Sequence, residues 1–241
     1  MAKSGTGTLT LDAVNTYANG TILSGGTLVV NGSLPAGGLT ISGGTRLGGN
    51  GTINSAVTLP SGATLAPGDG GPGTLTVNAG TTLQSGSTTL MEISKSPLAN
   101  DQLRVSDTLT YGGTLVVTNL SGTLAAEDAF QLFSAPSVSG AFDATDLPPL
   151  PGGLAWNFNR SSGVPRVVSP TPTSLTAMFS GSAFAVSWPA DHTGWRLQTQ
   201  TNGLNPTNWF DVPGSTATNL VYIPIDPAKG TVFFRLIYPF P

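Results

Sequence analysis

The sequence predicts an all-β protein in which a parallel β-solenoid is followed by a small antiparallel β-sandwich. Three observations carry this prediction. Apolar residues recur with a period of 18 or 19 over the first third of the 241 residues. Glycine is abundant before residue 130 and aromatic residues are abundant after it. Six strand-like runs with turn residues between them follow residue 174.

The period is visible in three rows of apolar residues. Leucines that follow Thr directly, or Thr-Arg in the case of Leu47, are spaced by 19, 19, 18 and 18 residues at Leu9, Leu28, Leu47, Leu65 and Leu83. A second row keeps the same period at Ile22, Ile41, Leu59 and Val77, and a fragment of a third row is formed by Leu34 and Ile53. Such self-similarity at a fixed period is the mark of a repeat architecture.

Each period is expected to form one coil of a β-solenoid. Glycine, asparagine and serine at the corners permit the positive φ values of tight bends. Residues of equal phase then stack about 4.8 Å apart and form interior ladders. A helix is disfavoured, because each glycine costs about 1 kcal/mol in a helix interior. An antiparallel sandwich also gives short strands, but its strands keep no fixed period. The pattern leaves open whether a coil has two strands or three.

The same residues carry a family resemblance. The segment GTGTLTLDAVNTYANGTILSGGTLVVNGSL, from Gly5 to Leu34, resembles the autotransporter-associated β-strand repeat in its NTY element and its paired GTL elements. Residues 46–83 and 101–142 are similar to later parts of autotransporter passengers, and the likeness covers about residues 4–168. The resemblance implies a secreted or surface-exposed β-helical stalk in bacteria, and it implies no enzymatic residues.

The composition changes near residue 130. Only two of 18 aromatic residues, Tyr17 and Tyr111, precede this point, whereas 23 of the 32 glycines do. A solenoid must cover the end of its ladders, so the bulky residues that follow are expected to cap it. We therefore predict a solenoid over residues 1–168, with its capping region from about residue 130. The Pro-bearing stretch SPTPTS at 169–174 is the predicted linker.

Residues 175–241 are expected to form an immunoglobulin-like sandwich. The six runs are SLTAMFS, AFAVSWPA, GWRLQTQTN, NWFDVPG, NLVYIPID and TVFFRLIYP. The segment FAVSWPADHTGWRLQTQ resembles the B and C strands of fibronectin type III modules, with Trp188 in the core position, and TVFFRLIYP resembles an F strand. The chain departs from that family because no evident G strand follows the F-like run.

Catalytic chemistry finds little support in the sequence. The only histidine, His192, has no G-x-S-x-G elbow to accompany it and is interpreted as an exposed turn residue. With no cysteine and one histidine, a transition-metal site is not expected. GDGGPG at 68–73 fits G-x-G-x-x-G, but a strand rather than a helix follows it, so we interpret it as a glycine-rich corner. The carboxylates do not recur at one phase of the period. We expect no enzyme, cofactor or metal.

Composition also indicates which classes of binding partner are not expected. A net charge of −3 gives no reason to expect nucleic acid or an anionic membrane surface as a partner, and no stretch approaches the length of a membrane span. The repeat starts within a few residues of Met1, so we expect the first coil to be uncapped and to expose strand edges. A second open edge is expected at the F-like run.

These observations predict a non-enzymatic, extracellular or surface-exposed structural protein that serves as a stalk or fibre subunit. Its partner is expected to be itself, or the rest of a longer repeat protein, through head-to-tail contacts that propagate. The candidate assembly edges are Thr8, Leu9, Thr10, Leu11, Val232, Phe233, Phe234, Arg235 and Leu236. The alternative is an adhesin or carbohydrate-binding fragment in which Trp195 and Trp209 stack on a glycan.

Overall fold

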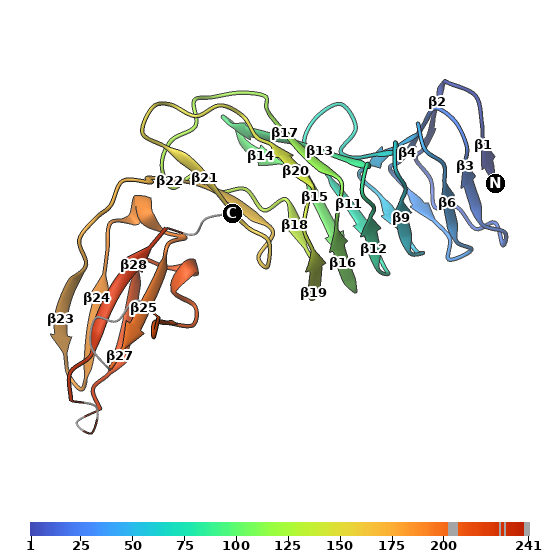
Figure 1. Ribbon diagram of the computed structural model, residues 1–241. Helices are drawn as coiled ribbons and strands as arrows, with labels where there is room; N and C mark the ends of the chain where they lie inside the picture. Colours follow the sequence, from blue (N-terminus) through green and yellow to red (C-terminus); the bar gives the residue numbers. More distant parts are fainter. Residues whose placement is uncertain (202–206, 227, 229, 239–241) are drawn as a thin grey trace. The chain divides into compact units, whose positions relative to one another are not determined.

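The computed structural model describes residues 1–201, 207–226, 228 and 230–238, and it is all-β as the sequence predicts (Figure 1). The chain forms two compact units, each considered by itself below. The first unit comprises Met1–Thr123, Phe130–Pro149 and Arg160–Val164. The second comprises Leu124–Ala129, Leu150–Asn159 and Pro165–Pro241. The last residue of the predicted run GWRLQTQTN, Asn202, and that of TVFFRLIYP, Pro239, lie outside the described residues.

The first unit is a parallel β-solenoid whose coils contribute strands to three faces, except that the first coil reaches the second face only through the isolated bridge of Val14 to Ser33. The first face contains, in order, β2 (Thr8–Leu11), β4 (Thr27–Val30), β7 (Arg46–Gly49), β10 (Thr64–Pro67), β13 (Thr88–Lys95), β17 (Thr114–Asn119) and β20 (Ala144–Asp146). The short β14 (Leu98–Asn100) pairs antiparallel with β13. The question of two or three strands per coil is thereby answered in favour of three.

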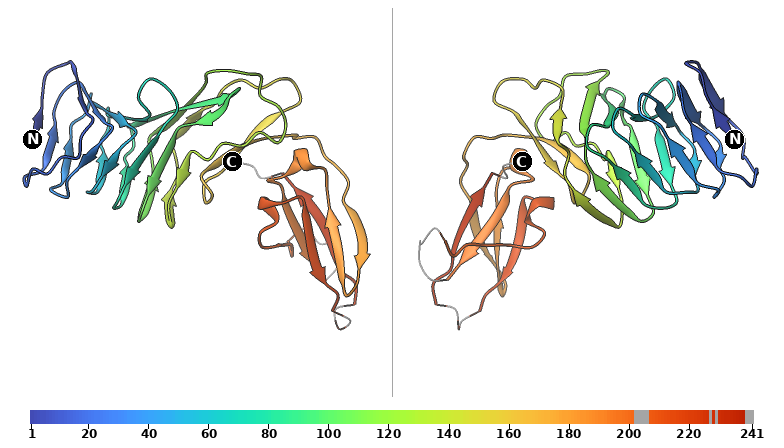
Figure 2. Two further views of the ribbon diagram at one scale, coloured as in Figure 1. Left: turned by 180° about the vertical axis from the view of Figure 1, so that it is seen from behind. Right: turned by 45° about the vertical axis from the view of Figure 1, so that its right-hand side comes forward.

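The other two faces are built in the same way. The second face contains β5 (Ser33–Leu34), β8 (Thr52–Ile53), β11 (Thr74–Val77), β15 (Gln102–Val105) and β18 (Phe133–Ser134). The third face contains β1 (Ala2–Lys3), β3 (Thr21–Leu23) and β6 (Leu39–Ile41) in one sheet, then β9 (Val57–Leu59), β12 (Thr81–Leu83), β16 (Thr108–Tyr111) and β19 (Ser137–Gly140) in another. Figure 2 shows the stack of coils from two further sides.

Much of the predicted leucine ladder is present in the strand register. Leu9 pairs with Leu28, Leu28 with Leu47, and Leu47 with Leu65. Leu28, Leu47 and Leu65 are fully buried. The third predicted row is also confirmed, because Leu34 pairs with Ile53. Leucine therefore fills the solenoid interior one coil above the next, which is where the hydrophobic stabilisation of the coils arises.

Other steps of the predicted rows are wrong. Leu65 pairs next with Thr89, 24 positions on, whereas Leu83 lies on another face and pairs with Leu59. In the second row, Ile22 pairs with Thr40. Val77 of the same row belongs to the second face and pairs with Ile53. After Leu65 the period is broken by the loop at residues 68–73, which lengthens one coil between β10 and β11. A fixed period of 18 cannot follow such an insertion. The pairing of Ile22 with Thr40 precedes this loop, and there the register is one position shorter than the predicted step of 19.

Aromatic side chains replace leucine toward the later coils. The ring centroids of Tyr111 and Phe133 are 5.3 Å apart in an edge-to-face arrangement, and Phe142 lies 5.0 Å from Tyr111 and 5.7 Å from Phe133. Phe130 and Phe133 are almost completely buried. Burial also raises the pKa of the Tyr111 hydroxyl, which donates a hydrogen bond to the carbonyl of Arg160 at 3.2 Å. Large rings thus fill the space where the leucine ladders end.

The second unit contains antiparallel sheets. One pairs β23 (Thr176–Ser180), β24 (Ala183–Ser187) and β27 (Leu220–Pro224), and another pairs β26 (Phe210–Asp211), β25 (Arg196–Gln200) and β28 (Phe233–Ile237). A two-stranded sheet is formed by β21 (Ala155–Asn159) and β22 (Val164–Val168), and two 3-10 turns, η1 (Ala190–His192) and η2 (Ser215–Ala217), complete the unit. Each of the six predicted runs contains one of these strands.

The core of the second unit is small. It is formed by Val186, Trp188 and Leu197, with Trp188 buried as predicted. Partly buried apolar side chains pack around this cluster: Leu175, Phe184, Val212, Val221, Ile223, Phe234 and Leu236. Val167, Val168 and Trp195 of this unit are also buried, outside the cluster. The side chains that surround the cluster remain half exposed to water, as is common in small domains.

Candidate functional site

The first candidate edge is β2, at the N-terminal side of the solenoid. Among the described residues β2 pairs with β4 alone. Thr8 and Thr10 are exposed, whereas Leu9 and Leu11 are half-buried over the fully buried Leu28 and Val30. The outer backbone edge of β2 and the outward side of its two leucines therefore face away from the stack. This geometry suits the addition of a further parallel or antiparallel strand.

Lys3 holds the turn beside β2 in place. Its side chain is buried, and Nζ donates hydrogen bonds to the carbonyl oxygens of Ser4 at 3.1 Å, Gly5 at 2.9 Å and Gly25 at 2.8 Å. The three donors of the ammonium group are thus all used on backbone acceptors. Nothing in the sequence around Lys3 indicates this role, because a lysine next to a glycine-rich stretch is normally part of a solvated segment. Lys3 stabilises the edge on which β2 lies.

The second candidate edge is β28. Among the described residues β28 pairs with β25 alone. All five of its residues are half-buried, and Phe234 and Leu236 pack against the core cluster. Val232, which precedes the strand, is 37% exposed. The core is therefore incompletely covered along β28, and the outer backbone edge of this strand is open in the described part of the chain.

Arg235 and Trp209 occupy the outer face of that sheet together. The guanidinium carbon of Arg235 lies 4.3 Å from the centroid of the Trp209 ring, and its Nε donates to Oε1 of Gln198 at 2.9 Å. Asp211 accepts hydrogen bonds from Gln198 at 2.6 Å and from Arg196 at 3.0 Å. One face of the Trp209 ring is thus covered by a cation, in a contact of the cation–π type.

Trp195, the other candidate for sugar stacking, is 5% exposed. Its Nε1 donates to the carbonyl of Ser169 at 3.1 Å, and its ring contacts Tyr238 and His192 at centroid distances of 5.3 and 4.9 Å. A buried ring offers no face to a glycan. The stacking role suggested for Trp195 therefore does not fit its position, because a unit with so small a core uses its large side chains for packing.

His192 is not an exposed turn residue, and that interpretation is wrong. The side chain is 4% exposed; Nδ1 lies 2.6 Å from Oδ1 of Asp191 and Nε2 lies 2.6 Å from the carbonyl of Thr171. A carbonyl can only accept, so Nε2 carries a proton. The contact ties the residues around Thr171 to the η1 turn. These two contacts and the packing of its ring against Trp195 give His192 a structural role in the second unit.

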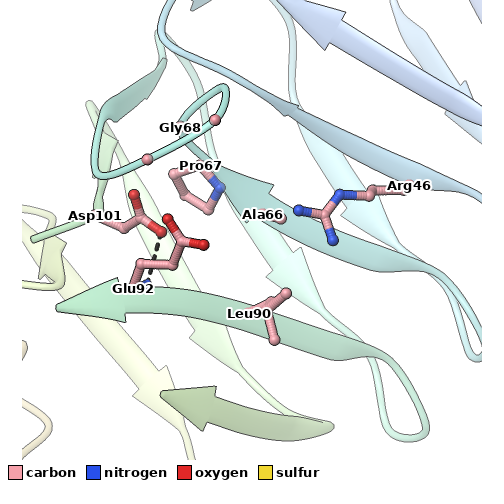
Figure 3. Close-up of a pocket in the computed structure, with 9 residues that line it drawn as sticks. Arg46, Ala66, Pro67, Gly68, Leu90, Glu92 and Asp101 are labelled. Carbon is pink, nitrogen blue, oxygen red and sulfur yellow. Dashed lines mark hydrogen bonds between the residues drawn. The ribbon is translucent and has the colours of Figure 1, made fainter. Parts of the chain in front are cut away.

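A small pocket lies on the first face of the solenoid (Figure 3). Its volume is about 40 Å³, and its polar lining residues are Arg46, Glu92 and Asp101. Asp101 is 1% exposed; Oδ1 accepts from the backbone N–H of Gly73 at 2.8 Å and Oδ2 from that of Glu92 at 2.8 Å. Asp101 thereby fastens the 68–73 loop to β13.

The electrostatics of this pocket are dominated by burial. Desolvation raises the pKa of Asp101 from 3.8 to about 7, against the two backbone N–H groups that stabilise the carboxylate. Glu92 adds a smaller rise and Arg46 a smaller reduction. A volume of 40 Å³ admits a water molecule or two but not a sugar ring or other organic substrate, since ligand pockets measure hundreds of Å³. The pocket is a structural joint of the 68–73 loop.

Polar side chains form a short ladder at the same corner of the coils. Nδ2 of Asn31 donates to Oδ1 of Asp12 at 2.9 Å and to Oδ2 of Asp69 at 2.9 Å. Oδ1 of Asn31 accepts from the backbone N–H of Asn50 at 3.2 Å. Among the residues that the structure describes, no three histidine, cysteine or acidic side chains are grouped so as to hold a metal ion. No helix in the same part of the chain is long and apolar enough to cross a membrane.

Comparison with known proteins bears on the N-terminal repeat. A search of curated proteins found no match to the chain. Residues 1–30 match the family model described as passenger-associated-transport-repeat. These residues include β1, β2, β3 and β4, so the match coincides with the first stacked coils of the solenoid. The resemblance of this segment to autotransporter passenger repeats is thereby supported over residues 1–30.

Proposed function

We propose that the chain is a non-enzymatic structural element of a secreted or surface-exposed bacterial protein of the autotransporter passenger kind. The observation that carries this proposal is the match of residues 1–30 to a passenger repeat on strands that stack as a parallel solenoid. A stack of short coils with a leucine interior is a rigid rod, which is the mechanical property that a stalk requires.

The second unit is proposed to be a fibronectin type III-like module. Its sheets have the strand orders β23–β24–β27 and β26–β25–β28. These orders correspond to strands A, B and E and to strands C′, C and F of an immunoglobulin-type sandwich. Trp188 at the end of β24 supports the assignment, because it lies in the core between the sheets.

The proposal also includes self-association of the chain through its strand edges. In this scheme β2 of one copy adds to β28 of the next copy, and Leu9 and Leu11 cover the half-buried Phe234 and Leu236. A contact between two different surfaces is heterologous, so it can propagate into filaments. The alternating Thr-Leu-Thr-Leu pattern of β2 suits strand addition, because only one of its faces is apolar.

Electron microscopy and light scattering of the purified chain test this scheme. The chain as it stands is expected to form filaments at micromolar concentration, and Thr10→Lys is expected to abolish them because a charge on an edge strand opposes pairing. Thr58→Lys is the matched control, since Thr58 is equally exposed but lies on β9, within the stack. Filaments that survive Thr10→Lys, or single rods for the unaltered chain, would exclude assembly through β2.

A second candidate function, glycan binding, is favoured by one observation. Trp209 is half-buried and adjoins Phe210, which is 70% exposed. Binding to a glycan array that is lost in Trp209→Ala and kept in Trp195→Phe would support an adhesin. Equal binding by Trp209→Ala and the unaltered chain would exclude a role for this ring.

A further inference from the structure

An unprotected strand edge lies in the second unit, at β23. Among the described residues β23 pairs with β24 alone. Its sequence, Thr-Ala-Met-Phe-Ser, contains no charged residue and no proline. Thr176, Ala177, Met178 and Phe179 are all exposed. Natural edge strands are normally protected by charge, proline or a bulge, and β23 has none of these.

The exposure of Phe179 is the second observation. In the register of the sheet, Phe179 pairs with Phe184, and Phe184 pairs with Ile223. Phe184 and Ile223 pack against the core cluster, so Phe179 belongs to the row that faces the core. Its ring lies 4.3 Å from that of Phe184, yet 76% of its surface is exposed. The core-facing row is therefore left uncovered at β23.

We propose that β23 pairs antiparallel with the β23 of a second copy, about a two-fold axis that passes beside Met178. Of the possible registers, this one pairs all five residues of the strand. Met178 then faces the Met178 of the second copy, and Phe179 faces Ala177. A large ring is thus placed opposite a methyl group in the core-facing row, so the two edges fill each other's space.

The charge distribution favours a second copy as the occupant. The fifteen residues of β23, β24 and β27 include no charged side chain. Although the chain has a net charge of −3, two copies that meet along this sheet therefore bring no like charges together. A strand edge of this composition is also self-complementary in the antiparallel sense, which an isologous contact requires.

The available area predicts a weak dimer. Phe179 is 76% exposed and Met178 is 63% exposed. Side chains of this size bury roughly 150–250 Å² each when fully covered. Four of them supply about 500 Å², and the paired backbone adds to this; stable interfaces bury about 1,200–2,000 Å². Association through β23 is therefore expected to depend on concentration and to close at two copies.

This dimer is separate from the proposed filament contact. It uses β23, which lies on the other main sheet from β28, and it joins identical surfaces. Failure of either contact leaves the other unaffected.

Disulfide trapping in the full chain tests the proposal, because the chain contains no cysteine. Residues that face each other in an antiparallel pair have Cα atoms about 4.5–5.5 Å apart, within the range of a disulfide. Met178→Cys is therefore expected to form a covalent dimer under mild oxidation. Thr176→Cys is the matched control, because its symmetry mate lies four residues along the strand, about 13 Å away.

The rates of dimer formation by the two cysteine variants distinguish the possible outcomes. Dimers from Met178→Cys at a rate at least tenfold above Thr176→Cys support the two-fold pairing. Equal rates would show random collision, and no dimer from either variant would show that the edges do not meet. Both of these results overturn the proposal.

A cysteine variant that fails to fold would form no dimer for an unrelated reason, so a second measurement uses no cysteine variant. Analytical ultracentrifugation over a concentration series is expected to show a monomer–dimer equilibrium for the Thr10→Lys variant, in which the proposed filament contact through β2 is removed. Phe179→Lys is expected to weaken this dimer at least tenfold. Tyr222→Lys is the control, since Tyr222 is 60% exposed on β27, which lies on the other side of β24 from β23. A dimer of the Thr10→Lys variant that is unchanged by adding Phe179→Lys, or no dimer in the Thr10→Lys variant, contradicts the pairing.

Discussion

Asp101 is the residue with the largest electrostatic consequence. Its carboxylate holds the backbone N–H groups of Gly73 and Glu92, yet burial raises its pKa to about 7. Because the folded pKa lies above the unfolded value of 3.8, the contribution of Asp101 to stability is fully present below about pH 3.8. It is lost as the pH rises through about 7. The folded chain binds this proton more tightly than the unfolded chain does.

The first prediction concerns Asp101→Asn. The variant is expected to lose the part of the pH dependence of the unfolding free energy that lies between pH 4 and pH 7, which is at most about 4 kcal/mol for a shift of this size. Urea unfolding of both proteins at a series of pH values measures it. Asp69→Asn, on the exposed side of the same loop, is the control. Parallel curves for Asp101→Asn and the unaltered chain would contradict the assignment.

Thr89 is a polar residue in the leucine ladder. It pairs with Leu65 on one side and Leu115 on the other, it is fully buried, and its hydroxyl has no hydrogen-bond partner. A hydroxyl buried in this way costs free energy, because it loses water without gaining a partner. The solenoid thus contains a local defect at the coil that follows the 68–73 loop.

Replacing that hydroxyl with a methyl group gives the second prediction. Thr89→Val is expected to raise the free energy of unfolding by about 1–2 kcal/mol, since the shape is kept and the unpaired group is removed. Thr88→Val, at the neighbouring half-buried position, is expected to change it by less than about 0.5 kcal/mol. Both values follow from equilibrium denaturation. Destabilisation by Thr89→Val would mean that the hydroxyl has a partner in solution.

At the scale of the element, the solenoid coil depends on close approach at its corners. Gly49 ends β7 with a φ of 112°, and a Cβ atom there would collide with the backbone of Val30 in the coil beside it. Gly44 also has a positive φ, of 77°, but a Cβ atom there would meet nothing. An alanine at Gly44 would suffer only from the unfavourable φ angle, whereas an alanine at Gly49 would suffer from the φ angle and from the collision between coils. Comparing the two substitutions therefore gives the two free-energy costs separately.

This comparison is the third prediction. Gly44→Ala is expected to destabilise the protein by about 1 kcal/mol, from backbone strain alone. Gly49→Ala is expected to cost at least about 3 kcal/mol, because the coils must also move apart. Thermal unfolding followed by circular dichroism ranks the two variants. Equal losses would show that the corner accommodates a side chain and that coil spacing is not limiting.

The strand edges are the other feature of this scale. β2, β23 and β28 each have one partner strand among the described residues. β28 carries Arg235, which Trp209 and Gln198 hold in place, whereas β23 carries no charge. By the usual rules of edge protection, β23 is thus more adhesive than β28.

At the scale of the whole molecule, the chain holds two separate cores. The first unit buries stacked leucines such as Leu47 and Leu65, and the second buries Val186, Trp188 and Leu197. Chains with more than one compact unit commonly depart from two-state unfolding. Moreover, the first unit resembles a repeat array, whose stability is a sum over neighbouring coils.

The fourth prediction follows from these two cores. Calorimetry is expected to resolve two transitions. Leu47→Ala is expected to lower the first unit's transition by several degrees, because Leu→Ala in a core costs about 2–5 kcal/mol. Leu197→Ala is expected to lower only the transition of the second unit. A single transition shifted by both variants would show that the units unfold together.

Sequence periodicity recovered the class of fold and the first part of the register. The steps from Leu9 to Leu65 are correct because consecutive coils there have 18 or 19 residues. The prediction failed at Leu83, since the insertion at 68–73 has no apolar residue that would mark its new phase. Trp188 was placed correctly in the core, because a large aromatic residue between strand-like runs is most stable when buried.

The stacking of coils follows from the amino-acid sequence alone, since repeated leucines and corner glycines act between residues one period apart. The run of antiparallel strands after residue 174 follows from it as well. Contacts between distant segments, in contrast, establish that a coil has three strands, that Lys3, Asp101 and His192 are buried and hydrogen-bonded, and that Phe179 is exposed. These features depend on which distant groups surround a side chain, and local patterns do not encode that environment.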